Sequence, residues 1–233
     1  MADLNFPSNP QIGDTYTIGN RTWVWNGSGW AIQTSITSLN PFTAVRAIIS
    51  TSTVATTTGT GALQVVGGVG IGGNLVVGGG AVTRNIINAN AYSSGVFSAP
   101  GDAQSRTFIL RKELNSTSTT ALTTNGSIAG VDNQVILPNY STFVFKAMIT
   151  ARAVGTNNEA GWELNGVVTR NASAGTTAIQ VVNKTKIWSS NLGYDVNVGV
   201  DLSLGALQVL ANIPDNNPVR FVAKVETVEV ISE

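Results

Sequence analysis

Apolar and polar residues alternate along three segments in the second half of the chain, which is the pattern of β-strands with one buried face. The segment 141–152 places four apolar residues on one face: Phe143, Phe145, Ala147 and Ile149. Residues 194–202 alternate in the same way. Residues 218–231 alternate until a change of parity near Thr227, which predicts a β-bulge. With turn residues between these runs, the pattern predicts an all-β, sandwich-like or jelly-roll-like domain over 106–233.

Residues 1–33 carry shorter alternating runs, TYTI and RTWVW, separated by turn residues. The Asn26-Gly27 pair favours a tight hairpin turn, because both residues accept positive φ. Trp23 and Trp25 share one face of a strand, and Trp30 can fold across from them. We predict a small β-hairpin module in which the tryptophans form a miniature core; a sugar-stacking platform is the alternative.

Residues 34–105 form an extended connector with a glycine-rich core at 59–80, where ten of 22 residues are glycine and eight are Leu, Val or Ile. A flexible linker would not carry the aliphatic residues, and one chain alone cannot bury them. We predict an intertwined trimeric β shaft, with a disordered linker as the alternative. In the shaft, other copies would cover Leu63, Val65, Val69, Ile71, Leu75 and Val77.

Charge and residue usage narrow the function classes. Charged residues make up 11% of the chain and the net charge is zero, so no general basic field attracts nucleic acid or an anionic membrane. No apolar run reaches the length of a membrane span, and we expect no membrane insertion. Cysteine and histidine are absent, which removes thiolate, histidine and common zinc chemistry. We therefore expect no cofactor and no enzymatic activity.

Two further patterns bear on partners. Residues 68–73 match the dinucleotide fingerprint G-x-G-x-x-G, but no helix follows to present its N-terminus to a phosphate. No acidic residue lies between Asp14 and Asp102. A segment that hides its surface against copies of itself does not need surface charge, so this favours self-association.

The segment STSTVATTTGTGALQVVGGVGIGGNLVVGGG (50–80) closely resembles one that recurs in virion structural proteins of tailed phages, particularly cyanophage tail fibres. PQIGDTYTIGNRTWVWNGSGW (10–30) is similar to a small Trp-rich module of the same proteins, and the terminal domain is similar to a C-terminal β domain of phage fibres. The resemblance implies a homotrimer assembled in the host cytoplasm and displayed on the virion exterior. The module with Trp23, Trp25 and Trp30 would dock onto other virion proteins.

These features predict a short tail fibre or spike for host attachment. A capsid decoration, cement or head-fibre protein needs the same assembly and is the alternative. A polysaccharide depolymerase is a remote alternative, in which two carboxylates would hydrolyse a glycosidic bond; the acids are Glu159, Glu163, Asp132, Asp195 and Asp201. If the terminal domain binds a bacterial surface glycan, the candidate contacts are Trp162, Trp188 and Tyr194, although each is also suited to a core or a trimer interface.

Overall fold

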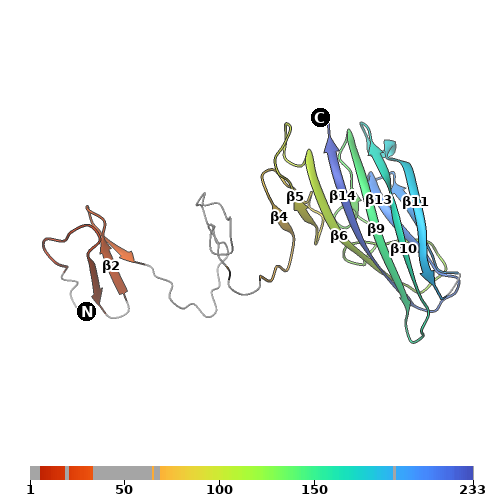
Figure 1. The fold of residues 1–233 in the computed structure, drawn as a ribbon, viewed down its shortest axis with the longest axis horizontal. Helices are drawn as coiled ribbons and strands as arrows, with labels where there is room; N and C mark the ends of the chain where they lie inside the picture. The colour runs from red at the N-terminus through yellow and green to blue at the C-terminus, as the bar shows by residue number, and fades with distance from the viewer. Residues whose placement is uncertain (1–5, 19–20, 34–64, 66–68, 191–192, 233) are drawn as a thin grey trace. The chain divides into compact units, whose positions relative to one another are not determined.

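The computed structural model describes residues 6–18, 21–33, 65, 69–190 and 193–232, and it divides the chain into two compact units, 1–67 and 68–233 (Figure 1). Within the described residues there are strands, one short 3-10 turn, η1 (Ala174–Thr176), and no α-helix, so the predicted all-β class is confirmed. No helix in this part of the chain is long and apolar enough to cross a membrane. Leu63 lies outside the described residues, as do the other connector residues in 34–64 and 66–68.

The N-terminal unit holds an antiparallel sheet of β1 (Thr15–Ile18), β2 (Arg21–Trp25) and β3 (Trp30–Gln33). Trp25 lies opposite Trp30, with ring centroids 5.7 Å apart. Phe6 stacks on Trp30 at 5.2 Å and meets the ring of Trp23 edge-on at 5.5 Å. Tyr16 contacts Phe6 from a third side. The aromatic rings therefore pack on one another, and Phe6, which the sequence did not single out, lies at their centre.

The turn between β2 and β3 differs from the two-residue hairpin that the Asn26-Gly27 pair suggested. Gly27 has a positive φ of 97°, but Asn26 does not. The side-chain oxygen of Asn26 instead accepts hydrogen bonds from the backbone N–H groups of Ser28 and Gly29. The asparagine thus forms an Asx-type turn that spans four residues.

In the C-terminal unit, the larger sheet has seven strands in the order β11-β10-β9-β14-β6-β5-β4, antiparallel except for β4 and β5. Their bounds are β4 (Leu75–Val77), β5 (Asn90–Tyr92), β6 (Ala103–Leu114), β9 (Ser141–Ala153), β10 (Glu159–Arg170), β11 (Ala178–Ser189) and β14 (Val219–Ile231). A smaller sheet contains β7 (Thr120–Ala121), β8 (Val135–Ile136), β12 (Asp195–Asp201) and β13 (Ala206–Asn212).

One hydrophobic core lies between the two sheets, which makes this unit a sandwich (Figure 1). Phe143 and Phe145 of β9 are buried there as predicted, and each contributes about 1.5–3 kcal/mol of burial free energy. Val196 of β12 and Val209 of β13 come from the opposite sheet. The core also takes in Ile86, a residue that the sequence assigns to the connector.

The predicted bulge near Thr227 is wrong. β14 pairs with β6 and with β9 without any register shift from Val219 to Val230. Burial continues to alternate through this stretch, so Thr227 and Glu229 occupy inward positions as polar residues. The sequence seems to change parity because polar residues face inward and valines face outward in this part of the strand, while the direction of each side chain stays regular. The structural register shifts of this sheet lie instead between β10 and β11.

Candidate attachment surface

The outer face of the seven-stranded sheet, which points away from the smaller sheet, carries an unusual number of exposed apolar side chains. The strand register places one residue of each strand in a single line across this face, which we call the valine row: Val181, Val167, Val144, Val228, Ser105, Tyr92 and Val77. Val144 is 53% exposed, Val228 66% and Tyr92 57%. The solvated face of an antiparallel sheet is normally polar, so this row is an exception.

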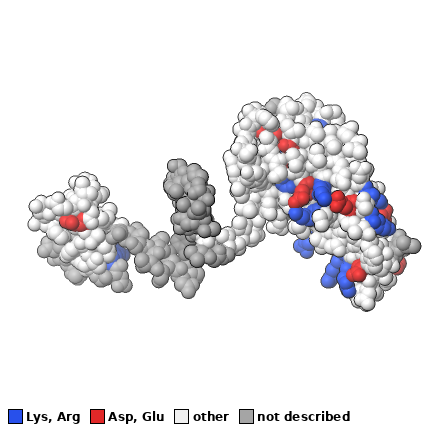
Figure 2. Space-filling model, in the orientation of Figure 1, with Lys and Arg blue, Asp and Glu red and all other residues white. Residues whose placement is uncertain are grey.

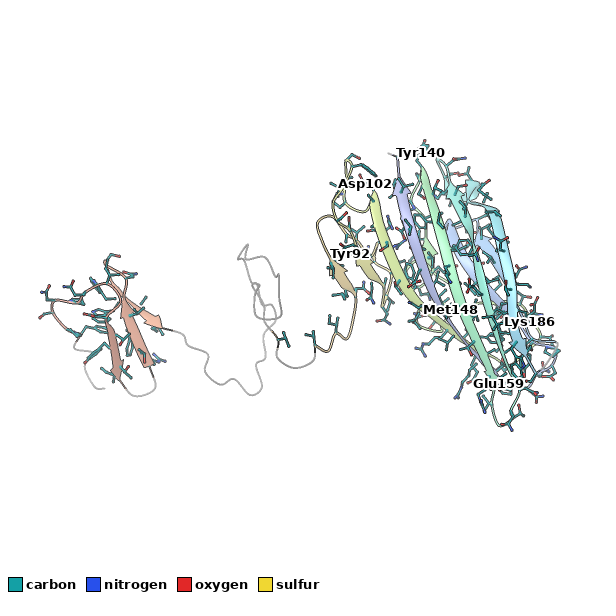
Figure 3. All side chains as sticks on the ribbon, viewed as in Figure 1. Tyr92, Asp102, Tyr140, Met148, Glu159 and Lys186 are labelled. Carbon is teal, nitrogen blue, oxygen red and sulfur yellow. The ribbon has the colours of Figure 1, made fainter. Side chains whose placement is uncertain are left out.

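Two hollows flank Tyr92, which is labelled in Figure 3. One, of about 450 Å³, lies along the ends of β6 and β14, and its lining includes Phe97, Val228 and Val230. The other, of about 170 Å³, lies toward β4, with Val77 in its lining. Phe97 is 78% exposed beside the first hollow. This end of the face therefore has both apolar recesses and apolar projections.

A charged band crosses the middle of the same face, formed by Lys146, Glu163, Lys224 and Glu226. Lys146 lies 3.2 Å from Glu163, and Lys224 lies 2.7 Å from Glu226. Acidic and basic side chains gather in a band over these strands, and a second group of charged side chains lies below it (Figure 2). Exposed pairs of this kind contribute about 0–1 kcal/mol each. The band therefore matters as a neutral, hydrogen-bonding surface more than as a source of stability.

A second apolar area, the lower patch, begins within the band, where Ile109 and Met148 pair with Lys224, and continues below it. The patch is made of Ile109, Met148, Val222, Ile187 and Trp188. A hollow of about 270 Å³ runs between the first four of these residues, with Lys224 on its wall. Trp188 is 54% exposed and lies opposite Gly161, which has no side chain to cover the indole. The lower patch thus combines an exposed aromatic ring, an apolar recess and nearby charged groups.

Of the three predicted glycan contacts, the structure leaves only Trp188 accessible. Trp162 is fully buried, stacked on Phe221 at 6.2 Å with the ammonium group of Lys186 6.0 Å from its ring. Tyr194 is 1% exposed. Neither ring can stack on a sugar, so the core alternative holds for Trp162 and Tyr194.

A bulge explains why the two neighbouring tryptophans face opposite ways. Trp162 pairs with Lys186, and continuing that register by two residues would place Trp188 opposite Ala160, which is in the core. The register shifts between Gly161 and Trp162, so Trp188 pairs with Gly161 instead. A one-residue shift moves a side chain to the other face of the sheet.

The five candidate carboxylates do not share partners. Glu159 is ion-paired with Arg152 at 2.8 Å, and Glu163 belongs to the charged band. Asp195 is paired with Lys184 at 2.9 Å. Asp201 accepts hydrogen bonds from Gln134 and from the N–H groups of Ser203 and Leu204, and these bonds, chiefly that from Gln134, lower the pKa of Asp201. For Asp132, the backbone oxygen accepts a hydrogen bond from Ile87.

A buried ionic cluster lies on the inner face, behind the end of β14. Glu229 accepts from Arg106 and from Arg84, both at 2.6 Å, and from Gln104 at 2.9 Å. The hydroxyl of Thr227 donates to the same carboxylate at 2.6 Å. The cluster ties β6, β14 and residue 84 together. The sequence analysis did not predict this cluster. The signal was that Arg106 and Glu229 fall at positions of alternating strands whose side chains face inward.

The charges of this cluster are held by one another. Burial raises the pKa of Glu229, but the Arg106 and Arg84 guanidinium groups outweigh it and hold the pKa below the usual range. Burial lowers the pKa of Arg106 to about 10, opposed by the Glu229 carboxylate. Near neutral pH Glu229 and Arg106 are therefore both charged, and the cluster stays an ion pair network.

The predicted shaft residues within the described chain are exposed. Val65 is 47% exposed, Val69 64% and Ile71 49%. Leu75 and Val77 belong to β4, whose parallel pairing with β5 leaves both side chains more than a third exposed. The trimeric shaft itself stays a prediction.

Neither a protein-family model nor a curated protein matches the sequence. Among solved structures, the chain is similar to the tailspike protein gp49 of the Acinetobacter baumannii bacteriophage Fri1, at 24% identity and a TM-score of 0.33, over 57% of this chain and 19% of that one. It is also similar to the tailspike protein of Acinetobacter baumannii phage AM24, at 12% identity and a TM-score of 0.27, over 60% of this chain and 29% of that one. The chain thus spans less than a third of the length of either tailspike protein.

This comparison corrects one expectation. The Fri1 tailspike is described as a capsular polysaccharide depolymerase, which is an enzyme. The expectation that this chain is not an enzyme is therefore contradicted. It rested on the absence of cysteine and histidine, and glycosidic bonds can be hydrolysed by carboxylates alone.

Proposed function

We propose that the chain is a structural protein of a phage virion, a homotrimeric short tail fibre or spike through which the particle attaches to the bacterial surface. The observation that carries the proposal is the exposure of Val65, Val69, Ile71, Leu75 and Val77 in the segment that resembles phage fibre proteins. Apolar residues spaced between glycines gain burial free energy only if something outside the chain covers them.

In this proposal the parts of the chain have separate roles. The glycine segment joins three copies. The N-terminal module, with Trp23, Trp25 and Trp30, docks onto other virion proteins. The sandwich presents its lower patch to a bacterial surface glycan, where a sugar ring stacks on Trp188 and its hydroxyl groups bond to the charged band.

Two measurements test the assembly and its place. Light scattering should give a trimer for the full chain and a monomer after deletion of residues 59–80. A monomer in both cases would remove the physical basis of the fibre. Gold-labelled antibodies on virions should mark the tail. Labelling of the head would instead support a decoration or head-fibre protein.

A third measurement tests the lower patch. Binding of the purified chain to host cells should fall in Trp188→Ala and persist in Phe97→Ala, which removes a more exposed aromatic ring outside the patch. Equal binding by both variants would exclude Trp188 as a contact.

A further inference from the structure

We infer that the valine row is a contact surface between copies of this chain, so that the association of the copies continues from the glycine segment across the sandwich. The inference rests on the proposed function, because it requires several copies. The sequence predicts contacts between copies only in the glycine segment. The inference adds a second contact surface, made of residues that the structure describes.

At the level of the valine row, polar residues of β14 face inward and apolar residues face outward. On the inner face, Thr227 and Glu229 are polar and buried. On the outer face, Val228 and Val230, their chain neighbours, are apolar and 66% and 45% exposed. A sheet that met solvent on its outer face here would gain by carrying the polar residues outside. The arrangement is favourable only if the outer face is also covered.

The surface around the valine row has both recesses and projections. Three members of the valine row, Val228, Ser105 and Tyr92, line the hollow of about 450 Å³, and Phe97 projects next to it. Valine side chains are stiff, so they lose little rotamer freedom when a partner covers them. Projections and recesses of matching apolar character on one surface allow like surfaces to interdigitate.

The charges of this face favour a second copy of the chain as the partner that covers it. The seven positions of the valine row include no charged residue, and the adjoining charged band contains two lysines and two glutamates. Such a surface does not repel another copy of itself. The row offers only the hydroxyl groups of Ser105 and Tyr92 for hydrogen bonding, too few to bind a hydroxyl-rich glycan specifically.

The valine row is continuous with the glycine segment. The row ends at Val77 of β4, which closes the glycine segment and forms one edge of the sheet. Copies joined through that segment bring their β4 strands close together. The valine row is the apolar surface that leads from β4 across the sheet, so it is the surface that this approach would cover.

The test is the solution mass of the full chain and its variants by light scattering over a dilution series. The double variant Val144→Lys, Val228→Lys places two unpaired ammonium groups in the contact, and we expect association to weaken about a hundredfold or more. Val222→Lys is the matched control, an exposed valine on the same strand and the same face but in the lower patch. It should leave the mass unchanged.

Circular dichroism should show the same β signature for all variants. If the lysine variant does not fold, Val144→Thr with Val228→Thr keeps the shape of the side chains and should still weaken association measurably. A trimeric wild type whose mass survives both double variants overturns the inference and leaves the proposed function standing. A monomeric wild type overturns both. Loss of host-cell binding with unchanged mass assigns the row to the receptor and also overturns the inference.

Discussion

Along β14, the half from Val219 to Val225 and the half from Thr227 to Ile231 direct side chains to the same two faces with different chemistry. In the first half, Phe221 and its inward neighbours are apolar, while Arg220 and Lys224 face outward. In the second half, Thr227 and Glu229 face inward and valines face outward. The comparison teaches that alternation fixes where a side chain points, whereas its polarity depends on what covers that face.

The inward-facing polar residues of the second half are held together by one carboxylate, that of Glu229. Glu229→Gln removes the charge that balances Arg106 and Arg84, so it should lower the free energy of unfolding by about 3–5 kcal/mol. Urea denaturation measures the loss. Glu226→Gln is the control on the same strand, because its pair with Lys224 is exposed and should be worth about 0–1 kcal/mol. Equal losses in the two variants would show that the buried cluster has no special weight.

The hydroxyl of Thr227 is a second polar group that the buried cluster needs on the inner face. Thr227→Val keeps the shape of the side chain but removes its hydrogen bond to Glu229, which should cost about 1.5–3 kcal/mol. Thr150→Val, on the exposed face of β9, should be close to neutral. If Thr227→Val were neutral as well, the inward position would tolerate an apolar residue, and the difference between the halves would not reflect the cluster.

Acid should act on the end of the sandwich that holds the cluster. Hydrogen bonds from the N–H groups of Ala99, Ser98 and Phe97 lower the pKa of Asp102 to about 2. The bond from Ala99 has the largest effect on this pKa. An unfolded chain protonates this group near pH 4. Between about pH 4 and pH 2 the unfolded state therefore binds more protons, so stability is complete above this window and falls as the pH is lowered through it.

The melting temperature measured from pH 6 to pH 2 should fall at the acid end. In Asp102→Asn that fall should be smaller, because the variant no longer contributes this proton. A wild type and a variant with parallel curves would show that the carboxylate does not hold the 97–99 turn as the structure has it.

The smallest effect is expected at the outer face. Trp188→Ala removes an exposed ring and should change stability by less than about 0.5 kcal/mol. Trp162→Ala, one strand away but buried, should cost about 3–5 kcal/mol. A large loss in Trp188→Ala would mean that the indole is a packing residue and that the lower patch is not free to bind a ligand.

Much of the sandwich could be predicted from local pattern. The strict alternation in β9 identified Phe143, Phe145 and their neighbours as one buried face, and the structure confirms them. Alternation near Tyr194 likewise predicted β12 and its inward residues. These predictions succeed because the residues of a strand that face the core recur at every second position, so the buried face is visible in the sequence.

The rest depended on contacts between distant parts of the chain. Arg106 and Glu229 lie 123 residues apart, so nothing local announced that they neutralise each other. The register shift at Gly161 places Trp188 on the outer face of the sheet, and the sequence of β11 alone does not reveal this shift. The valine row could not be foreseen either, because it exists only once the strands are placed side by side.

The two edges of the large sheet differ in what can be added to them. β11 is twelve residues long, its pairing with β10 is interrupted by two register shifts, and Lys184 and Lys186 turn toward β12 and Tyr194. Irregular pairing and inward-directed charge discourage another strand from adding to an edge. β4, three residues long, has neither feature. Growth of the sheet by strand addition is therefore hindered at the β11 edge, and in the proposed assembly copies that meet through β4 would form a closed group and would not polymerise into ribbons.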